Sequence, residues 1–451
     1  MNKEWVEKQW QGSELGDKRL AKRAVKIGAA CLETPDGSLP KKFGSWGDTK
    51  GAYRFFDSNG VSHEALQKVH NKNVIQAASI TEQMVLFIQD GSELIYNTHK
   101  CTHGLGPTAD AFGQGIMFHT ALAVEWAGKQ DPVVIGVAKQ TAWIRPEYSE
   151  DKKVKEQEEK ESQVWLNMLK DIGRPPPGSR WVSVGDRGSD IYEYVVGAVH
   201  EGWDLVVRAK HDRTILVDGK NSKLKAWIRG LKPSAEYKLD LRSRGDKFSR
   251  VAELKVAWGE VLMQPPQGKK GETIRVTYIR AYDPADAELE WILITTLAVA
   301  SAEDALAIVR IYEQRWIIEE YHKCLKTGCR IEEAQLKTGK RLLALLGVLG
   351  VIATQLLKLR DLSRQQPDIP AKEVMDKEII DIVKSKYKLK EEISLKELWR
   401  RIAMMGGFLG RKSDGNPGWQ TIWKGWLRIQ DMLAGMAIFK KNIDFHYENH
   451  A

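Results

Sequence analysis

Cysteine is scarce in this sequence, which argues against an extracellular fold held together by disulfides. The 451 residues include only Cys31, Cys101, Cys324 and Cys329, whose spacings form no disulfide framework. The first residues, Met-Asn-Lys-Glu-Trp, also lack the basic and then apolar layout of a secretory signal. We therefore expect reduced thiols and a cytoplasmic protein.

Long hydrophobic stretches are also lacking, apart from one run between Leu342 and Leu357. Gly347, Gly350, Thr354 and Gln355 interrupt this run. It is shorter than the roughly 20 apolar residues that a membrane-spanning helix needs. The run predicts a buried helix and no membrane association.

Two sequence signatures of other chemistries are missing. No Gly-x-x-x-x-Gly-Lys-Ser/Thr loop occurs, which argues against ATP-driven chemistry. His99, Cys101 and His103 are metal-ligand types at close spacing, but no later Cys-x-x-Cys completes a zinc site. No internal repeat of fixed period is present either.

What the chain has is apolar material for several cores and an excess of positive charge. Hydrophobic residues make up 42% of it, including 16 tryptophans, and its length predicts two or three domains. The formal net charge is +9, with Lys and Arg spread through every region. A basic surface favours polyanionic partners, nucleic acid first, although many soluble proteins are also basic.

One stretch combines a phenol, two cations and a carboxylate at helical spacing: Tyr312-Glu-Gln-Arg-Trp-Ile-Ile-Glu-Glu-Tyr-His-Lys-Cys-Leu-Lys326. In one continuous helix, Tyr312, Arg315, Glu319 and Lys326 fall within an arc of roughly 60°. A solvated helix with charge pairs is the simpler interpretation. Because the same stretch carries Trp316 and other apolar residues, a half-buried helix that presents a site is favoured.

Two further carboxylates are predicted at the ends of buried strands. Val85-Leu-Phe-Ile-Gln leads into Asp90, and Trp181-Val-Ser-Val-Gly leads into Asp186. Between them lie two more strand-type runs, at 115–126 and 132–144, and a charged helix that starts near 150. A helix at 192–200 and a strand at 203–210 follow. Three strands, then helix, strand, helix and strand is the order of a ribonuclease-H-like α/β core.

The rest of the chain surrounds this core. Alternating apolar and charged residues at about 211–288 predict an antiparallel β insertion, after which residues 290–296 return to a buried strand. We expect three domains: a helical domain at 1–75, the catalytic core with its insertion at 76–365, and a helical domain at 366–451. Gly406-Gly-Phe-Leu-Gly-Arg and Trp423-Lys-Gly-Trp predict a packed elbow and an exposed contact patch in the last domain.

Together, Asp90, Asp186 and Glu319 predict a site for divalent metal. Taken alone, either aspartate is better explained as a turn residue at the end of a strand. Three acids in a core order that places the first and fourth strands side by side favour a shared site instead. Oxygen ligands suit Mg²⁺, and two such ions promote in-line displacement at phosphorus.

Cationic and aromatic side chains near these acids predict contacts with DNA. Arg binds phosphate with a planar fork, Lys binds it as a point charge, and a phenol can donate to a phosphate oxygen. Trp291 is explained either as core or as a residue that stacks on an unpaired base. His322 is predicted either to contact a phosphate or to orient the acids without contacting the ligand itself. The full set of predicted DNA contacts is Tyr312, Arg315, Lys326, Trp291, Arg208, Lys210, Lys323, His322, Arg54 and Arg19.

These motifs resemble one known family. Tyr312-x-x-Arg-x-x-x-Glu319-x-x-x-x-x-x-Lys326, Ile-Gln-Asp90 and Gly-Asp186-Arg-Gly-Ser-Asp-Ile-Tyr are similar to the bacterial insertion-sequence DDE transposases that carry the Y-R-E-K signature. Leu-Gly-Asp-Lys-Arg and Gly-Ala-Tyr-Arg-Phe resemble the end-binding domain of that family. One difference is Gly91-Ser92 after the first aspartate, where many relatives have Thr-Thr.

The resemblance implies cut-and-paste transposition by a bacterial, nucleoid-associated homodimer that binds double-stranded transposon ends and target DNA. It implies nicking, hairpin formation and strand transfer, with two Mg²⁺ or Mn²⁺ ions held by Asp90, Asp186 and Glu319. Two alternatives remain: a ribonuclease-H-like nuclease without end specificity, and a DNA-binding relative that acts only as an inhibitor.

Overall fold

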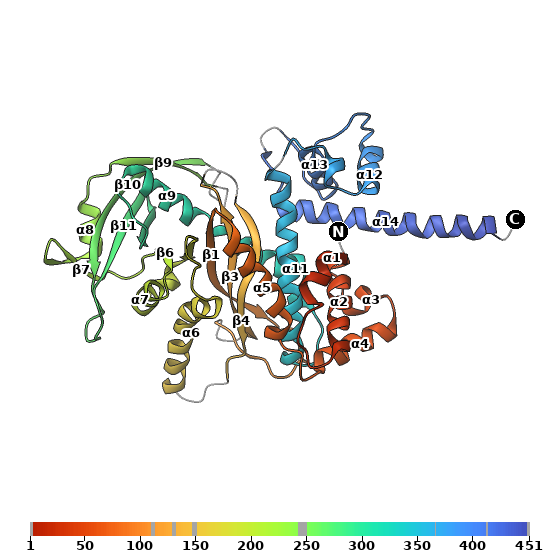
Figure 1. The fold of residues 1–451 in the computed structure, drawn as a ribbon, viewed down its shortest axis with the longest axis horizontal. Helices are drawn as coiled ribbons and strands as arrows, with labels where there is room; N and C mark the ends of the chain where they lie inside the picture. Colours follow the sequence, from red (N-terminus) through yellow and green to blue (C-terminus); the bar gives the residue numbers. More distant parts are fainter. Residues whose placement is uncertain are drawn as a thin grey trace. The chain divides into compact units, whose positions relative to one another are not determined.

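The computed structural model contains mostly helical segments and one large mixed β-sheet (Figure 1). It describes residues 3–109, 113–128, 132–146, 151–241, 250–365, 367–411 and 414–448. The chain divides into two compact units. The first comprises Met1–His70, Leu94–Leu105 and Glu320–Ala451, and the second comprises Asn71–Glu93 and Gly106–Glu319.

The sheet of the second unit has the predicted core order. Strands β4 (Val133–Trp143), β3 (Gln114–Trp126), β1 (Met84–Ile95), β5 (Arg180–Gly185) and β6 (Asp204–Arg208) lie side by side in this sequence. β1 and β5 are parallel, β5 and β6 are parallel, and β3 and β4 are antiparallel. A two-residue strand, β2 (Gly106–Pro107), pairs with β3. The mixed α/β core predicted from the sequence is confirmed, and the first and fourth core strands do lie side by side.

The expected end of the first strand was wrong, because β1 continues past Asp90 to Ile95. Its parallel pairing with β5 ends at Ile88 and Val184, so Asp90 lies just beyond the paired part. Asp186 lies where it was expected, directly after β5. Both aspartates therefore project from the point where the β1–β5 ladder ends.

Helices cover both faces of this sheet. Side chains alternate between the faces of a strand, and odd-numbered residues such as Phe87 and Leu205 enter a core with Trp165 of α6 (Asp151–Ile172) and Tyr194 of α7 (Tyr192–His200). Helix α9 (Ala302–Glu313) packs against β5 and β6. The even-numbered aspartates belong to the face away from α6 and α7.

The predicted antiparallel insertion is confirmed. It contains β7 (Thr214–Val217), β8 (Lys220–Lys223), β9 (Ala235–Leu241), β10 (Arg250–Met263) and β11 (Ile274–Asp283), and returns through β12 (Asp286–Thr295). Neighbouring strands of this set are antiparallel, and β12 pairs with β6, so the insertion extends the core sheet. Helix α8 (Leu224–Gly230) within it was not predicted.

A single helix over 312–326 was also wrong. Helix α9 ends at Glu313, a turn follows at Gln314 and Arg315, and α10 runs over Trp316–Lys323 before a π-helix at Cys324–Gly328. At the turn, the Arg315 amide donates to the Tyr312 carbonyl, three residues back, which tightens the backbone. The regular spacing assumed for Tyr312, Arg315, Glu319 and Lys326 does not hold across these junctions.

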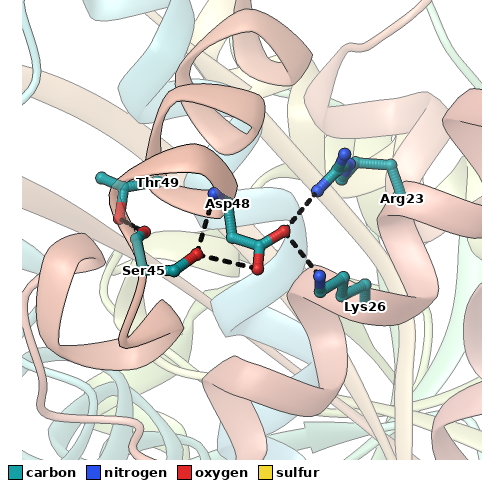
Figure 2. A network of polar contacts seen from close by, with 5 residues as sticks. All are labelled: Arg23, Lys26, Ser45, Asp48 and Thr49. Atoms are coloured by element: carbon teal, nitrogen blue, oxygen red, sulfur yellow. Dashed lines mark hydrogen bonds and ion pairs between the residues drawn. The ribbon is translucent and has the colours of Figure 1, made fainter.

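The first unit is helical, as predicted for the N-terminal part. Its first segments are α1 (Lys3–Trp10), α2 (Lys18–Glu33), α3 (Leu39–Phe43), α4 (Trp46–Asp57) and the start of α5 (His63–Ile80). Asp48 links α4 to the basic helix α2, because its Oδ1 accepts from Arg23 Nη1 at 3.2 Å and from Lys26 Nζ at 2.5 Å. Ser45 caps α4 beside it (Figure 2). Two of the cations of α2 are therefore paired within the domain.

The apolar run forms most of α11 (Gly339–Gln365). Its segment Gly339–Lys358 is long and apolar enough to cross a membrane, but 78% of the segment is buried inside the protein. This burial agrees with the buried helix that the sequence predicts.

The C-terminal elbow is confirmed, and of the expected exposed stretch Leu409 is exposed while the tryptophans are buried. Helix α12 (Lys377–Tyr387) precedes α13 (Leu395–Met405) and the long α14 (Trp419–Glu448). A Cβ on Gly425 would lie 1.7 Å from the Ile402 carbonyl oxygen, so glycine allows α13 and α14 to touch. Trp426 packs against Trp399 of α13 in this contact, and Trp423 is also buried. Further along α14, the exposed apolar side chains are Met432, Met436, Ile438 and Phe439.

Candidate active site

Asp90 is the most perturbed carboxyl group of the site. It lies on β1 after five fully buried residues, and its side chain keeps 21% of its accessible surface. Burial raises the pKa of Asp90 to about 7, and repulsion by Asp186 and then by Glu319 contributes, while Arg315 opposes the rise. Asp186 and Glu319 therefore both lie close enough to Asp90 to repel its carboxylate.

Asp186 is held by the turn that follows β5. Its Oδ1 accepts from the Gly188 amide at 2.8 Å and caps the 3-10 helix η1 (Arg187–Ser189). The Ser189 hydroxyl donates to the Asp186 carbonyl at 2.6 Å. A Cβ on Gly188 would come within 3.0 Å of the carboxylate, so glycine leaves room for it. The Gly-Asp-Arg-Gly-Ser sequence thus fixes where this carboxylate points.

Arg315 bridges the other two acids. Its Nη2 is 2.5 Å from Glu319 Oε1, and its Nη1 is 3.8 Å from Asp90 Oδ2. The Arg315 side chain keeps only 16% of its surface. Burial is the largest influence on the pKa of this guanidinium and lowers it. The hydrogen bond that Arg315 donates to Glu319, together with attraction to Tyr312, Glu319 and Asp90, leaves the pKa raised on balance. A mostly buried positive charge therefore lies between Asp90 and Glu319.

An aromatic and cationic group adjoins this bridge. The ring of Tyr312 lies 5.2 Å from the ring of Trp291, nearly edge-on. Arg208, on β6, donates to the Glu290 carbonyl at 2.8 Å and lies beside the Tyr312 hydroxyl. Burial raises the pKa of Tyr312, and Arg208 partly offsets this. Trp291 packs against Tyr312 here, and its stacking on a base stays a prediction.

The other predicted DNA contacts are described by their own surroundings. Lys210, Lys323 and Arg54 are exposed, and Arg19 is exposed while it binds Asp17, the cap of α2. Lys326 lies 4.0 Å from Glu332, in the π-helix region. His322 is 7% exposed and faces the Tyr321 ring, so its phosphate contact would need a change of exposure.

The acids suit a cation, but they do not form a ready-made metal cage. Within the described ranges, no three His, Cys, Asp or Glu side chains lie close enough to hold an ion as they stand, and this includes His99, Cys101 and His103. The charge balance nevertheless favours added positive charge, because burial and the nearby acids destabilise ionised Asp90.

Asp190 was not predicted as a site residue, and the structure shows it as a buried support of the chain segments beside the site. Its carboxylate is fully buried and accepts from the amides of Lys210 and His211 at 2.6 and 2.8 Å. Arg213 completes the pairing with a contact of 2.6 Å. Asp190 thus ties the turn after Asp186 to the chain that carries Arg208 and Lys210. The second aspartate of Gly-Asp-Arg-Gly-Ser-Asp was the available signal.

The chain matches three families of known proteins. Residues 2–61 match the family described as Transposase DNA-binding, residues 151–355 match Transposase DDE domain, and residues 351–443 match Transposase Tn5 dimerisation domain. Asp186 and Glu319 lie within the DDE match, and Asp90 lies between the first two matches in the chain.

Proposed function

We propose that the chain is a DNA transposase of the Tn5 type that works by cut-and-paste transposition through hairpin ends, because its three family matches are to DNA-binding, DDE and dimerisation parts of transposases. The observation that carries the proposal is the pairing of Arg315 with both Asp90 and Glu319, with Asp186 near enough to raise the pKa of Asp90. A surplus of buried acid beside fixed cations suits a site that receives metal and phosphate together.

We assign Asp90, Asp186 and Glu319 as the metal ligands. DDE transposases depend on divalent metal in general, and the proposed ligands are all oxygen donors, which suit Mg²⁺ or Mn²⁺. Two bound ions would activate the attacking oxygen and stabilise the leaving oxygen of an in-line displacement.

The cations of the site have a separate task. With metal on Asp90 and Glu319, the Arg315 guanidinium would be released from these carboxylates and would bind a phosphate of the end strand with its planar fork. Tyr312 and Arg208, which already lie together, would hold a neighbouring phosphate. Tyr312, Arg315, Glu319 and Lys326 form the proposed Y-R-E-K group. Its phenol and its cations would hold the scissile phosphate in place and would take no part in the bond changes themselves.

The proposed reaction alternates hydrolysis of a phosphodiester bond with the exchange of one phosphodiester bond for another. Water first adds to phosphorus and releases a 3′-hydroxyl at the transposon end. That hydroxyl attacks the opposite strand and forms a hairpin, a second water reopens it, and the freed 3′-hydroxyl joins target DNA. Each attacking oxygen gives up its proton, and each leaving oxygen gains one. Since strand transfer makes one ester as it breaks another, no nucleotide is consumed, in agreement with the missing ATP loop.

The transposition complex would contain two copies of the chain. The match to a dimerisation domain supports dimer formation, and one active site would act on each end. The exposed apolar residues of α14 form a surface that a second copy of the chain would bury.

The test uses DNA that carries the inverted repeats flanking the gene, incubated with Ca²⁺ or with Mg²⁺. We expect binding in both and nicks and hairpins in Mg²⁺ only. Asp186→Ala should bind the ends and fail to nick, whereas Asp240→Ala, at an exposed position of β9, should behave as the wild type. Cleavage of any duplex without end preference would point to a nuclease instead. End binding without strand breakage in either metal would point to an inhibitor.

A further inference from the structure

A buried polar side chain lies next to the first catalytic aspartate, on the opposite face of the sheet. Gln89 has no accessible surface. Because successive residues of a strand face opposite sides, Gln89 enters the core beneath α6 and α7 while Asp90 faces the site. A buried amide among apolar residues destabilises a core unless its hydrogen bonds are made.

The amide of Gln89 makes these bonds with three different elements. Its Nε2 donates to Ser183 Oγ of β5 at 3.0 Å and reaches Tyr194 Oη of α7 at 3.3 Å. Its Oε1 faces His119 Nε2 of β3 at 3.1 Å, and Ser183 and Tyr194 are joined at 2.7 Å. Burial lowers the pKa of His119 to about 3, so the imidazole is neutral and its Nε2 hydrogen can be donated to Gln89.

The position of this network relates it to the site. The β1–β5 ladder ends at Ile88 and Val184, and the bond from Gln89 to Ser183 connects the two strands at that end. Asp90 is the next residue on one strand, and Asp186 follows Ser183 by three residues on the other. A shift of either strand would therefore change how the two carboxylates oppose each other.

We propose that Gln89 is a positioning residue that sets the spacing of Asp90 and Asp186 and thereby the affinity of the site for divalent metal. The inference rests on the proposed function, in which these aspartates are ligands. Replacing a residue that orients a metal ligand without touching the metal typically lowers metal affinity about 10–100-fold.

The test compares Gln89→Met with the wild type, because methionine keeps the length and most of the volume of the side chain but cannot make the amide hydrogen bonds. The first readout is the Mn²⁺ concentration that half-saturates nicking of end DNA. The second is direct Mn²⁺ binding to the protein with end DNA, followed by electron paramagnetic resonance, which does not require turnover. For Gln89→Met we expect at least about a tenfold rise in the Mn²⁺ concentration that half-saturates nicking and in the Mn²⁺ concentration that half-saturates binding. End binding in Ca²⁺ should not change.

Gln140→Met is the matched control. Gln140 is also a buried amide of the sheet, and it donates to Thr120 Oγ1 at 2.8 Å between β4 and β3. It should lose a similar amount of stability, seen in thermal denaturation, without a change in Mn²⁺ dependence. If Gln89→Met does not fold, Ser183→Ala removes one partner of the amide and should produce a smaller rise of the same kind.

The outcomes separate the two levels of the proposal. Wild-type Mn²⁺ dependence in a folded Gln89→Met or Ser183→Ala protein would overturn the role of Gln89, as would an equal shift in Gln140→Met. A wild type that binds Mn²⁺ but never nicks its ends would contradict the proposed function, while the binding measurement would still decide the role of Gln89.

Discussion

Replacing Asp90 by asparagine should stabilise the metal-free protein above pH 7, although it removes a proposed ligand. In the folded chain, burial and the nearby Asp186 and Glu319 raise the pKa of Asp90 to about 7, against an ordinary value of about 3.9. The folded state therefore holds this proton more tightly than the unfolded state. Stability from this group is complete below about pH 4 and falls as the pH rises to about 7.

The size of the effect follows from the same two pKa values. Their difference of about three, at about 1.36 kcal/mol per pKa unit, gives an upper limit of about 4 kcal/mol at pH 8. Because the Asp90 side chain keeps 21% of its surface, water reduces this, and we expect Asp90→Asn to gain about 2 kcal/mol of unfolding free energy. At pH 5, about one unit above the unfolded pKa, only about a third of this gain should remain.

Urea denaturation at pH 5 and pH 8, with a chelator and then with saturating Mn²⁺, measures this. Mn²⁺ should stabilise the wild type and have little effect on Asp90→Asn. Asp283→Asn is the opposite control, because a hydrogen bond from Arg250 lowers the pKa of Asp283, so its replacement should destabilise the protein at pH 8. If Asp90→Asn were less stable than the wild type at pH 8 without metal, the claim that burial and the nearby acids destabilise ionised Asp90 would be refuted.

Three further changes have distinct expected outcomes. Asp190→Ala leaves Arg213 buried without its partner and should lower the unfolding free energy by about 3–5 kcal/mol in urea denaturation. A loss below about 1 kcal/mol would contradict a stabilising role for the Asp190–Arg213 ion pair. Arg315→Ala should reduce nicking about 100-fold and leave end binding by the first 75 residues nearly intact in gel-shift assays, and full nicking activity would exclude Arg315 from the phosphate contacts. Gly425→Ala places a Cβ 1.7 Å from the Ile402 carbonyl oxygen, so it should separate α13 from α14 and weaken the dimer in sedimentation, and an unchanged dimer would show that the contact is not needed.

The sequence predicted the core because its signals are local. Apolar runs of strand length that end in aspartate defined β1 and β5, and alternation defined the insertion strands. The same reasoning placed Asp90 and Asp186 together, since neighbouring parallel strands bring equivalent ends to one edge, while Glu319 was proposed from helical spacing.

What the sequence did not predict depends on contacts distant in the chain. The break between α9 and α10 at Gln314 occurs in residues that are all compatible with a helix, so no local signal marks it. Asp190 reads as an ordinary turn residue until Arg213 is placed against it. The tryptophans near Trp423 look like a surface patch until Gly425 is seen to bring two helices into contact.

The proposed reaction depends on direct ligation of metal by Asp90, Asp186 and Glu319. Replacing one ligand oxygen by another atom tests this ligation most directly. In Asp186→Cys, a sulfur donor replaces oxygen, and sulfur binds Mg²⁺ poorly but accepts Mn²⁺ more readily. The account predicts end nicking by this variant in Mn²⁺ and almost none in Mg²⁺, while the wild type is active in both. Equal activity of Asp186→Cys in the two metals would contradict it.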